Sequence, residues 1–329
     1  MFRIITVLLY KQYRGKIMKI LIALLLITNT IFALNNKELS TTIDLSGKQR
    51  MLTQEMAKEA FLIKLDIDKK TNIEKLAQNS QLFDKTLKAL INGDKKLELR
   101  PIKNTKIQAQ LKKVISIWNP YYKEIKDIIN GKNSKKSYSV ISSQNSMLLK
   151  EMDTVVKLYT SQNKKSNFVL INDVNLAGKQ RMLLQKMAKS LVVANNGIDV
   201  EKYRNDFIDA KRLFTKTLKG LLEGDKELKL KGTKLSLIRK QLEVVNKLWN
   251  SEQKRLKDAL VGKNTKSAIL ALDNISVEMD KSFKLYTESF NRQKQRNEFA
   301  SLIKIYTSLE KMDNQTKLLL EKLAKVEVE

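Results

Sequence analysis

The sequence contains no cysteine and no histidine. Without cysteine the chain cannot form disulfides, thiolate metal sites or a thiol nucleophile, and without histidine it lacks the commonest general base. Only Lys, Asp, Glu or Tyr side chains could act as an acid or base, and no spacing in the sequence nominates any of them. We therefore predict a protein that is not an enzyme, with no catalytic residues, no metal and no cofactor.

Proline and glycine are also scarce, with two prolines and ten glycines among 329 residues. Lys, Leu, Ile, Asn and Glu are abundant instead, and this balance favours helix over strand and loop. Hydrophobic residues make up 42% of the chain, which is enough for real cores. The composition predicts an all-α protein.

Acidic residues are few, since 63 Lys and Arg face 35 Asp and Glu and give a formal charge of +28. Such a charge attracts anionic polymers, lipids or small anions. The basic residues are spread along the chain, and no nucleic-acid-binding motif is present. We therefore do not expect a nucleic-acid partner.

Two stretches of the chain are nearly identical. They read IDLSGKQRMLTQEMAKEA over residues 43–60 and VNLAGKQRMLLQKMAKSL over residues 174–191, an offset of 131. The same offset relates Trp118 to Trp249. A repeat of this length marks a duplicated unit, so we expect two whole domains in tandem.

Apolar residues recur at the helical period along both copies, which predicts four helices in each. We expect these helices at about 39–65, 73–97, 105–129 and 136–163, and again at about 168–195, 200–223, 235–260 and 265–291. The predicted fold is two tandem antiparallel four-helix bundles, at 34–165 and 166–293, followed by a C-terminal amphipathic helix at 294–329.

Local features refine this prediction. Gly93 predicts that the second helix ends or bends there. Pro120 lies inside the third helix and predicts a kink that the second copy, with Ser251 in that place, need not share. No proline or glycine separates Tyr159 from Asn175. A helix continuous across this boundary would favour two bundles joined rigidly end to end.

The N-terminal stretch has the layout of a secretory signal peptide. Residues 16–33 carry basic side chains, an apolar run at 20–27 and a small residue, Ala33, at a suitable cleavage point. We predict a signal peptide over 1–33, with Met18 as a second candidate start, and a mature protein in the periplasm. An uncleaved membrane anchor is the alternative, although the apolar run is shorter than the roughly 20 residues that a span needs.

The repeated motif has two faces on a helix. Gly47, Arg50, Gln54 and Lys58, with Met51, form one stripe at spacings of three and four residues. A separate apolar seam is interrupted only by Glu59. We expect the seam to pack within its own bundle and the stripe to face a second copy of the same helix, where glycine permits close backbone approach.

The arginine of the stripe is the candidate ligand-binding group. Its guanidinium presents a planar fork of donors that suits a planar oxyanion or carboxylate. Arg50 and Arg181 would repel each other across a helix pair unless an anion lay between them. The alternative interpretation is structural: Arg50 pairs with Asp44 or Glu55, and Gly47 merely eases helix packing.

Both stretches resemble the signature helix of the PilJ-type sensor domain, named for the chemoreceptor linked to type IV pili. They are also similar to the motif helix in the periplasmic sensors of nitrate/nitrite histidine kinases. The signature reads Asn or Asp, two residues, Gly, two residues, Arg-Met, then Gln three residues on. The resemblance implies a periplasmic antiparallel four-helix bundle whose arginine binds an anion between two subunits. Together, the stripe and the resemblance select these ligand-binding residues: Arg50, Arg181, Gly47, Gly178, Met51, Met182, Gln54 and Gln185.

We therefore predict a periplasmic, non-catalytic sensory protein that binds a small anionic ligand, nitrate-like or a carboxylate, and signals through a membrane partner. Two arrangements remain open. Arg50 and Arg181 could share one ligand in an internal pseudo-dimer, or each could face its own copy in a homodimer. The alternative function is a structural scaffold that binds an acidic envelope polymer or protein through its basic surface.

Overall fold

The computed structural model describes residues 41–97, 99–132, 134–161 and 170–326. The predicted signal peptide and the boundary at 165/166 lie outside these ranges, so both stay predictions.

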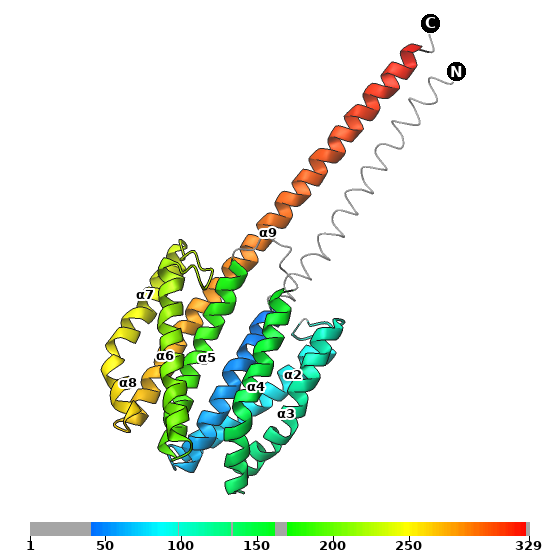
Figure 1. Ribbon diagram of the computed structural model, residues 1–329. Helices are drawn as coiled ribbons and strands as arrows, with labels where there is room; N and C mark the ends of the chain where they lie inside the picture. The colour runs from blue at the N-terminus through cyan, green and yellow to red at the C-terminus, as the bar shows by residue number, and fades with distance from the viewer. Residues whose placement is uncertain (1–40, 98, 133, 162–169, 327–329) are drawn as a thin grey trace. The chain divides into compact units, whose positions relative to one another are not determined.

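The described residues fold into α-helices joined by short turns (Figure 1). The first repeat consists of 41–64, which we call the first motif helix, α2 (Lys69–Asn92), α3 (Thr105–Ile129) and α4 (Lys135–Ser161). The second consists of α5 (Leu170–Asn195), which we call the second motif helix, α6 (Val200–Glu223), α7 (Ser236–Ser251), α8 (Gln253–Leu260) and α9 (Thr265–Val326). The predicted all-α fold with two tandem bundles is confirmed.

The second helix of each repeat ends at a glycine. Gly93 follows α2 with φ 78°, and Gly224 follows α6 with φ 104°. A Cβ at Gly93 would lie only 2.8 Å from the carbonyl oxygen of Leu99, so this tight turn requires glycine. The turn is closed by a two-way backbone pair between Asp94 and Leu99, at 2.9 Å each way. The predicted break is confirmed, and α2 ends earlier than expected because the turn takes the following residues.

The third helix is interrupted in the repeat that lacks the proline. α3 continues through Pro120 as one helix, whereas its counterpart is divided at Glu252 into α7 and α8. The single helix expected at 235–260 was therefore wrong. At the break, Ser251 and Gln253 each donate to a backbone carbonyl one turn earlier, at 2.9 and 2.6 Å.

The fourth helix of the second repeat does not end near residue 291. α9 runs on to Val326, so the predicted C-terminal amphipathic helix is its distal part, and residues from 291 onward belong to a separate unit. Apolar side chains such as Phe299 and Ile303 are exposed there. None of the described helices has the length and hydropathy to cross a membrane.

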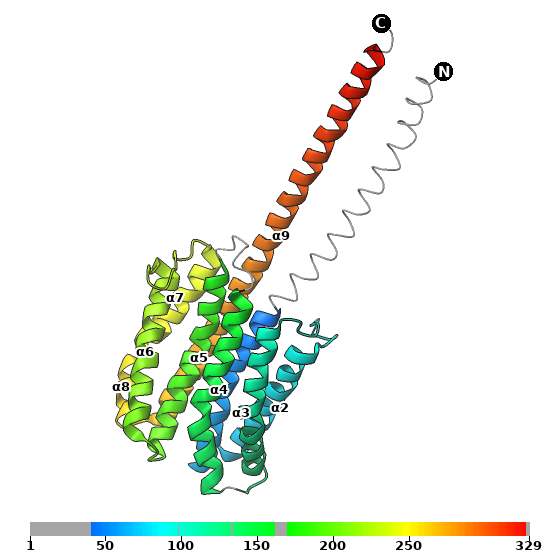
Figure 2. The ribbon, with the colours of Figure 1, turned by 45° about the vertical axis from the view of Figure 1, so that its right-hand side comes forward.

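Within the unit 38–290, the two repeats share one hydrophobic core. Asn196 donates to the carbonyl of Phe61 at 3.2 Å, and the Tyr203 hydroxyl donates to the carbonyl of Ser142 at 3.2 Å. The repeats thus lie side by side (Figures 1 and 2), and the end-to-end arrangement was wrong. Lateral packing buries whole apolar helix faces, which a continuous connecting helix would have left in water.

Candidate ligand site between the two repeats

The two motif helices lie against each other and run in the same direction. Arg50 contacts Asn175 near the start of both helices, and Lys58 contacts Gln185 further along. The polar stripe of each motif helix therefore faces the other copy within one chain, as the pseudo-dimer hypothesis predicted.

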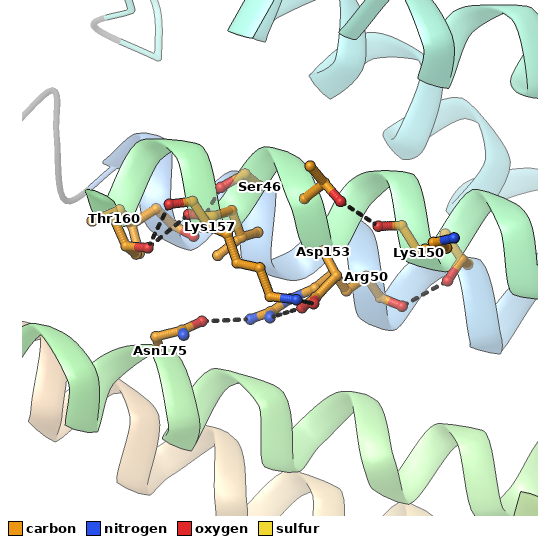
Figure 3. Close-up of polar contacts among 11 residues, drawn as sticks. Ser46, Arg50, Lys150, Asp153, Lys157, Thr160 and Asn175 are labelled. Carbon is orange, nitrogen blue, oxygen red and sulfur yellow. Dashed lines mark hydrogen bonds and ion pairs between the residues drawn. The ribbon is translucent and has the colours of Figure 1, made fainter. Parts of the chain in front are cut away.

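Arg50 is buried and bonded on two sides (Figure 3). Its Nη1 donates to Asp153 of α4 at 2.7 Å, and its Nη2 donates to Asn175 of the second motif helix at 3.2 Å. Lys157 holds the other oxygen of Asp153 at 2.8 Å. Burial alone would raise the pKa of Asp153, but Arg50 and Lys157 outweigh it and the pKa is lowered. The carboxylate is therefore ionised, and Arg50 ties the repeats together.

Both motif glycines border the guanidinium of Arg50. A Cβ added at Gly47 or at Gly178 would lie 3.8 Å from its Nη2. The room that the two glycines leave is filled by a guanidinium rather than by the backbone of the facing helix. Arg50 pairs with neither Asp44 nor Glu55, the partners that the structural interpretation had offered.

Arg181 occupies the equivalent place in the second repeat and pairs with Asp280, the counterpart of Asp153. Its Nη1 donates to Asp280 of α9 at 2.5 Å, and the guanidinium lies over the ring of Phe283 at 3.8 Å. Asp44 of the first repeat lies 3.5 Å from Nη2, where Arg50 meets an asparagine. Yet Nε and Nη2 are buried and donate no hydrogen bond to any described residue. These two N–H groups form the side edge of the fork, which can bind a planar oxyanion with both donors.

Arg181 is one of the residues that line a cavity of about 650 Å³. The first motif helix, α2, the second motif helix and α9 all contribute to its wall. Three predicted ligand-binding residues line it: Met51, Arg181 and Gln185. The other five, Arg50, Gln54, Gly47, Gly178 and Met182, are not among its lining residues.

The cavity also holds charged residues that the sequence analysis did not select. Lys58 donates to Gln185 and to Asp273 of α9, at 2.8 Å each. Glu59 is 2% exposed, and its Oε1 accepts from Asn79 of α2 at 2.7 Å. Its Oε2 has no hydrogen-bond partner among the described residues. In the sequence, Glu59 interrupts an apolar helix face. This was the signal that could have identified Glu59 as part of the site.

Burial and charge shift the acid–base behaviour of these groups. Burial raises the pKa of Glu59 well above its ordinary value. Burial also raises the pKa of Glu55, against the effect of Lys58. For Lys58, burial acts to lower the pKa, but Asp273, Glu55 and Glu59 outweigh it and the pKa is raised. Lys58 is therefore a charged ammonium inside the wall. Among the described residues, no group of three or more carboxylates is arranged to hold a metal ion.

Comparison with known proteins places the chain in a family. The model of PilJ, described as the N-terminal domain of type IV pili methyl-accepting chemotaxis transducers, matches residues 35–143 and 172–275. The chain belongs to the PilJ family. Each matched segment contains one motif helix, so the resemblance read from the motif is confirmed as two tandem PilJ copies. No curated protein matches the chain.

The two PilJ copies differ at the position of the buried lysine. Lys189, the counterpart of Lys58, donates to Asn145 of α4 at 3.1 Å and has no carboxylate bonded to it among the described residues. Burial lowers the pKa of Lys189 to about 7, although Asp206 opposes this shift. The second copy thus lacks the carboxylate that holds Lys58 charged, and the two sides of the pseudo-dimer are electrostatically unequal.

Proposed function

We propose that this PilJ protein is a non-catalytic sensory protein of the periplasm, in which Arg181 binds the anionic group of a small ligand. The proposal is carried by Arg181, which lines the cavity and whose Nε and Nη2 are buried without a hydrogen bond to any described residue. A buried donor without a partner costs free energy that a ligand oxyanion would recover. The family of chemotaxis-transducer domains supports a sensory role rather than a catalytic one.

In this proposal the two motif arginines have separate roles. Arg50 is already bonded to Asp153 and Asn175 and holds the repeats together. Arg181 receives the ligand, with Gln185 and Met51 in the same wall. An anion bound at Arg181 would alter the contacts between Arg181, Asp44 and α9, and we propose that a membrane signalling partner reads this change. The ligand-mediated homodimer is not needed, because one chain supplies both motif helices.

The test is a thermal-shift titration of the full chain with nitrate, nitrite, acetate and larger carboxylates. Binding to the native state raises the melting temperature by mass action. We expect a saturable rise with one class of anion, lost in Arg181→Gln and kept in Arg212→Gln, an exposed arginine paired with Asp209. If no anion raises the melting temperature, or if Arg181→Gln responds as the wild type does, the proposal fails.

A second variant separates binding from folding. Asp44 is 43% exposed and competes for Nη2 of Arg181 at 3.5 Å. Asp44→Asn recreates the residue present at Asn175, removes that competition and should strengthen anion binding several-fold. A misfolded variant cannot bind more tightly, so a gain of affinity would support the site directly. Failure of all anions, with salt-sensitive binding to an acidic polymer instead, would favour the scaffold function.

A further inference from the structure

The charge balance of the cavity differs from that of the chain. Its wall carries six basic and five acidic side chains, whereas the whole chain carries 63 basic and 35 acidic ones. A site for a simple anion in so basic a protein has no need of carboxylates, because each one repels the ligand. Their presence points to a ligand that is not purely anionic.

The charges are separated along the cavity. At one end lie Arg181, Lys48 and Lys284, together with Asp44 and with Asp280, which pairs with Lys284 at 2.9 Å. Toward the other end lie Glu55 and Glu59, with Lys58 and Lys75 near Glu59. The order follows from the chain: Lys48 comes about two helical turns before Glu55, and Glu55 one turn before Glu59, on the first motif helix. The cavity is therefore more basic at the Arg181 end and more acidic at the Glu59 end.

Lys58 and Lys75 both act to lower the pKa of Glu59, but burial outweighs them and the pKa is raised. Lys58 directs its hydrogen bonds to Gln185 and Asp273 and makes none to Glu59. The Oε2 of Glu59 is buried without a partner among the described residues, just as Nε and Nη2 of Arg181 are. Both residues line one cavity, and each has buried side-chain atoms without a hydrogen bond to a described residue. A buried acceptor and buried donors that lack hydrogen bonds each cost free energy. A ligand that carries both a hydrogen-bond donor and an acceptor would satisfy both groups.

We infer that the ligand carries an ammonium group as well as a carboxylate, as an α-amino acid does, with its carboxylate on Arg181 and its ammonium on Glu59 and Glu55. This inference rests on the proposed anion site at Arg181 and specifies the chemistry of the other half of the ligand. Glu55 interacts electrostatically with both Lys58 and Arg181 and so lies between the two ends. Gln185 follows Arg181 by about one helical turn and contacts Lys58, the residue before Glu59.

The second repeat offers an internal comparison. Its counterparts of Glu55 and Glu59 are Lys186 and Ser190, so the carboxylates are confined to one side of the pseudo-dimer. The inference therefore predicts one zwitterion site in each chain, on the side where Arg181 meets the first motif helix.

The test is calorimetric titration of the full chain with the common α-amino acids, each beside its N-acetyl derivative and the carboxylic acid that lacks the amine. We expect at least one amino acid to bind saturably, with the two analogues about tenfold weaker or more, since a charge-assisted hydrogen bond is lost. Glu59→Gln should remove this preference and still bind the carboxylic acid. Arg181→Gln should lose both ligands. Asp209→Asn, at an exposed ion pair, is the matched control and should bind as the wild type does.

The outcomes separate the two proposals. If the carboxylic acid binds as tightly as the amino acid, or if Glu59→Gln keeps the preference, the zwitterion inference is overturned and the anion site remains. If simple amines bind and no anion does, the anion site itself is wrong. If neither class binds, both proposals fall. Melting curves of each variant without ligand show whether a loss of binding reflects a loss of folding.

Discussion

Arg50 and Arg181 show how one residue in a duplicated motif takes two roles. Their sequence neighbours are the same, yet Arg50 meets a neutral amide at Asn175 and Arg181 meets the carboxylate of Asp44. Arg50 leaves only its Nε without a hydrogen bond to a described residue, whereas Arg181 leaves both Nε and Nη2 without one. The two arginines thus differ in how many donors the fold already uses.

Arg50→Ala should lower the free energy of unfolding by about 3 kcal/mol, because it leaves the buried side of Asp153 without its partner. Urea denaturation of the full chain measures this. The double variant with Asp153→Ala should lose less than the sum of the two single changes, since the unpaired charge is gone. Strict additivity would show that the pair contributes no coupling.

Lys189 should impose a pH dependence on stability. Its pKa is about 7 when folded and near the ordinary 10.5 when unfolded, so the unfolded chain binds more protons between these values. The free energy of unfolding should therefore rise with pH across this window, by about 1 kcal/mol per pH unit at most. Below pH 7 the buried lysine is charged, and the cost of burying that charge is fully present.

Lys189→Met removes the titrating group and should flatten the unfolding free energy between pH 7.5 and 9.5. The groups around Lys189 are the ring of Tyr203, the Asn145 amide, and the charged Asp206, Lys186 and Lys202. Exposed Lys202 supplies the control, because Lys202→Met should keep the rise. An unchanged slope in Lys189→Met would refute the assignment.

At the scale of the element, helix geometry decides what a motif glycine is for. Gly47 and Gly178 both lie within helices and face the same guanidinium. A Cβ at Gly47 would lie 3.8 Å from Nη2 of Arg50, which is an ordinary van der Waals distance. A Cβ at Gly178 would lie 3.2 Å from the ring of Phe283, which is closer than most such contacts. That ring lies under Arg181, so the second glycine is coupled to the candidate site and the first is not.

Gly47→Ala should therefore stabilise the chain, by up to about 1 kcal/mol, through helix propensity alone. Gly178→Ala should gain less or lose stability, because the Phe283 ring must move. It should also weaken anion binding at Arg181, which thermal-shift titration would detect. Equal stability gains in the two variants, with unchanged binding in both, would show that the ring adjusts freely.

At the scale of the whole molecule, the unit 38–290 should unfold as one body, because both repeats contribute to a single hydrophobic core. Each repeat contains one tryptophan: Trp118 packs on Phe83 at 4.2 Å between ring centroids, and Trp249 packs on Phe214 at 4.5 Å. Trp118→Phe and Trp249→Phe therefore give two chains in which fluorescence reports on one repeat alone.

In each single-tryptophan variant, the fluorescence transition in urea should coincide with the far-ultraviolet circular dichroism transition of the same variant. Coincidence in both variants is expected if the core is shared. A fluorescence transition that precedes the loss of helix in either variant would mean that the repeats unfold independently, and the side-by-side packing would then contribute little stability.

The sequence by itself determined the helices and the duplication. Apolar periodicity is a local property, so α3 and α6 begin and end where it predicted, and the glycine after α2 marks a turn that only glycine tolerates. The interruption at Glu252 was missed because the apolar pattern continues across it, with Trp249 and Leu256 buried on either side.

Only the tertiary structure decided which copy of the motif carries the candidate site. Arg181 and Glu59 are 122 residues apart in the sequence, and neither reveals an unused hydrogen-bonding atom until the helices around it are in place. The burial and the hydrogen bonds of these two side chains depend on residues from four helices, which belong to both repeats. The motif therefore predicted the chemistry of an arginine, while packing determined which arginine lines the cavity and what charges surround it.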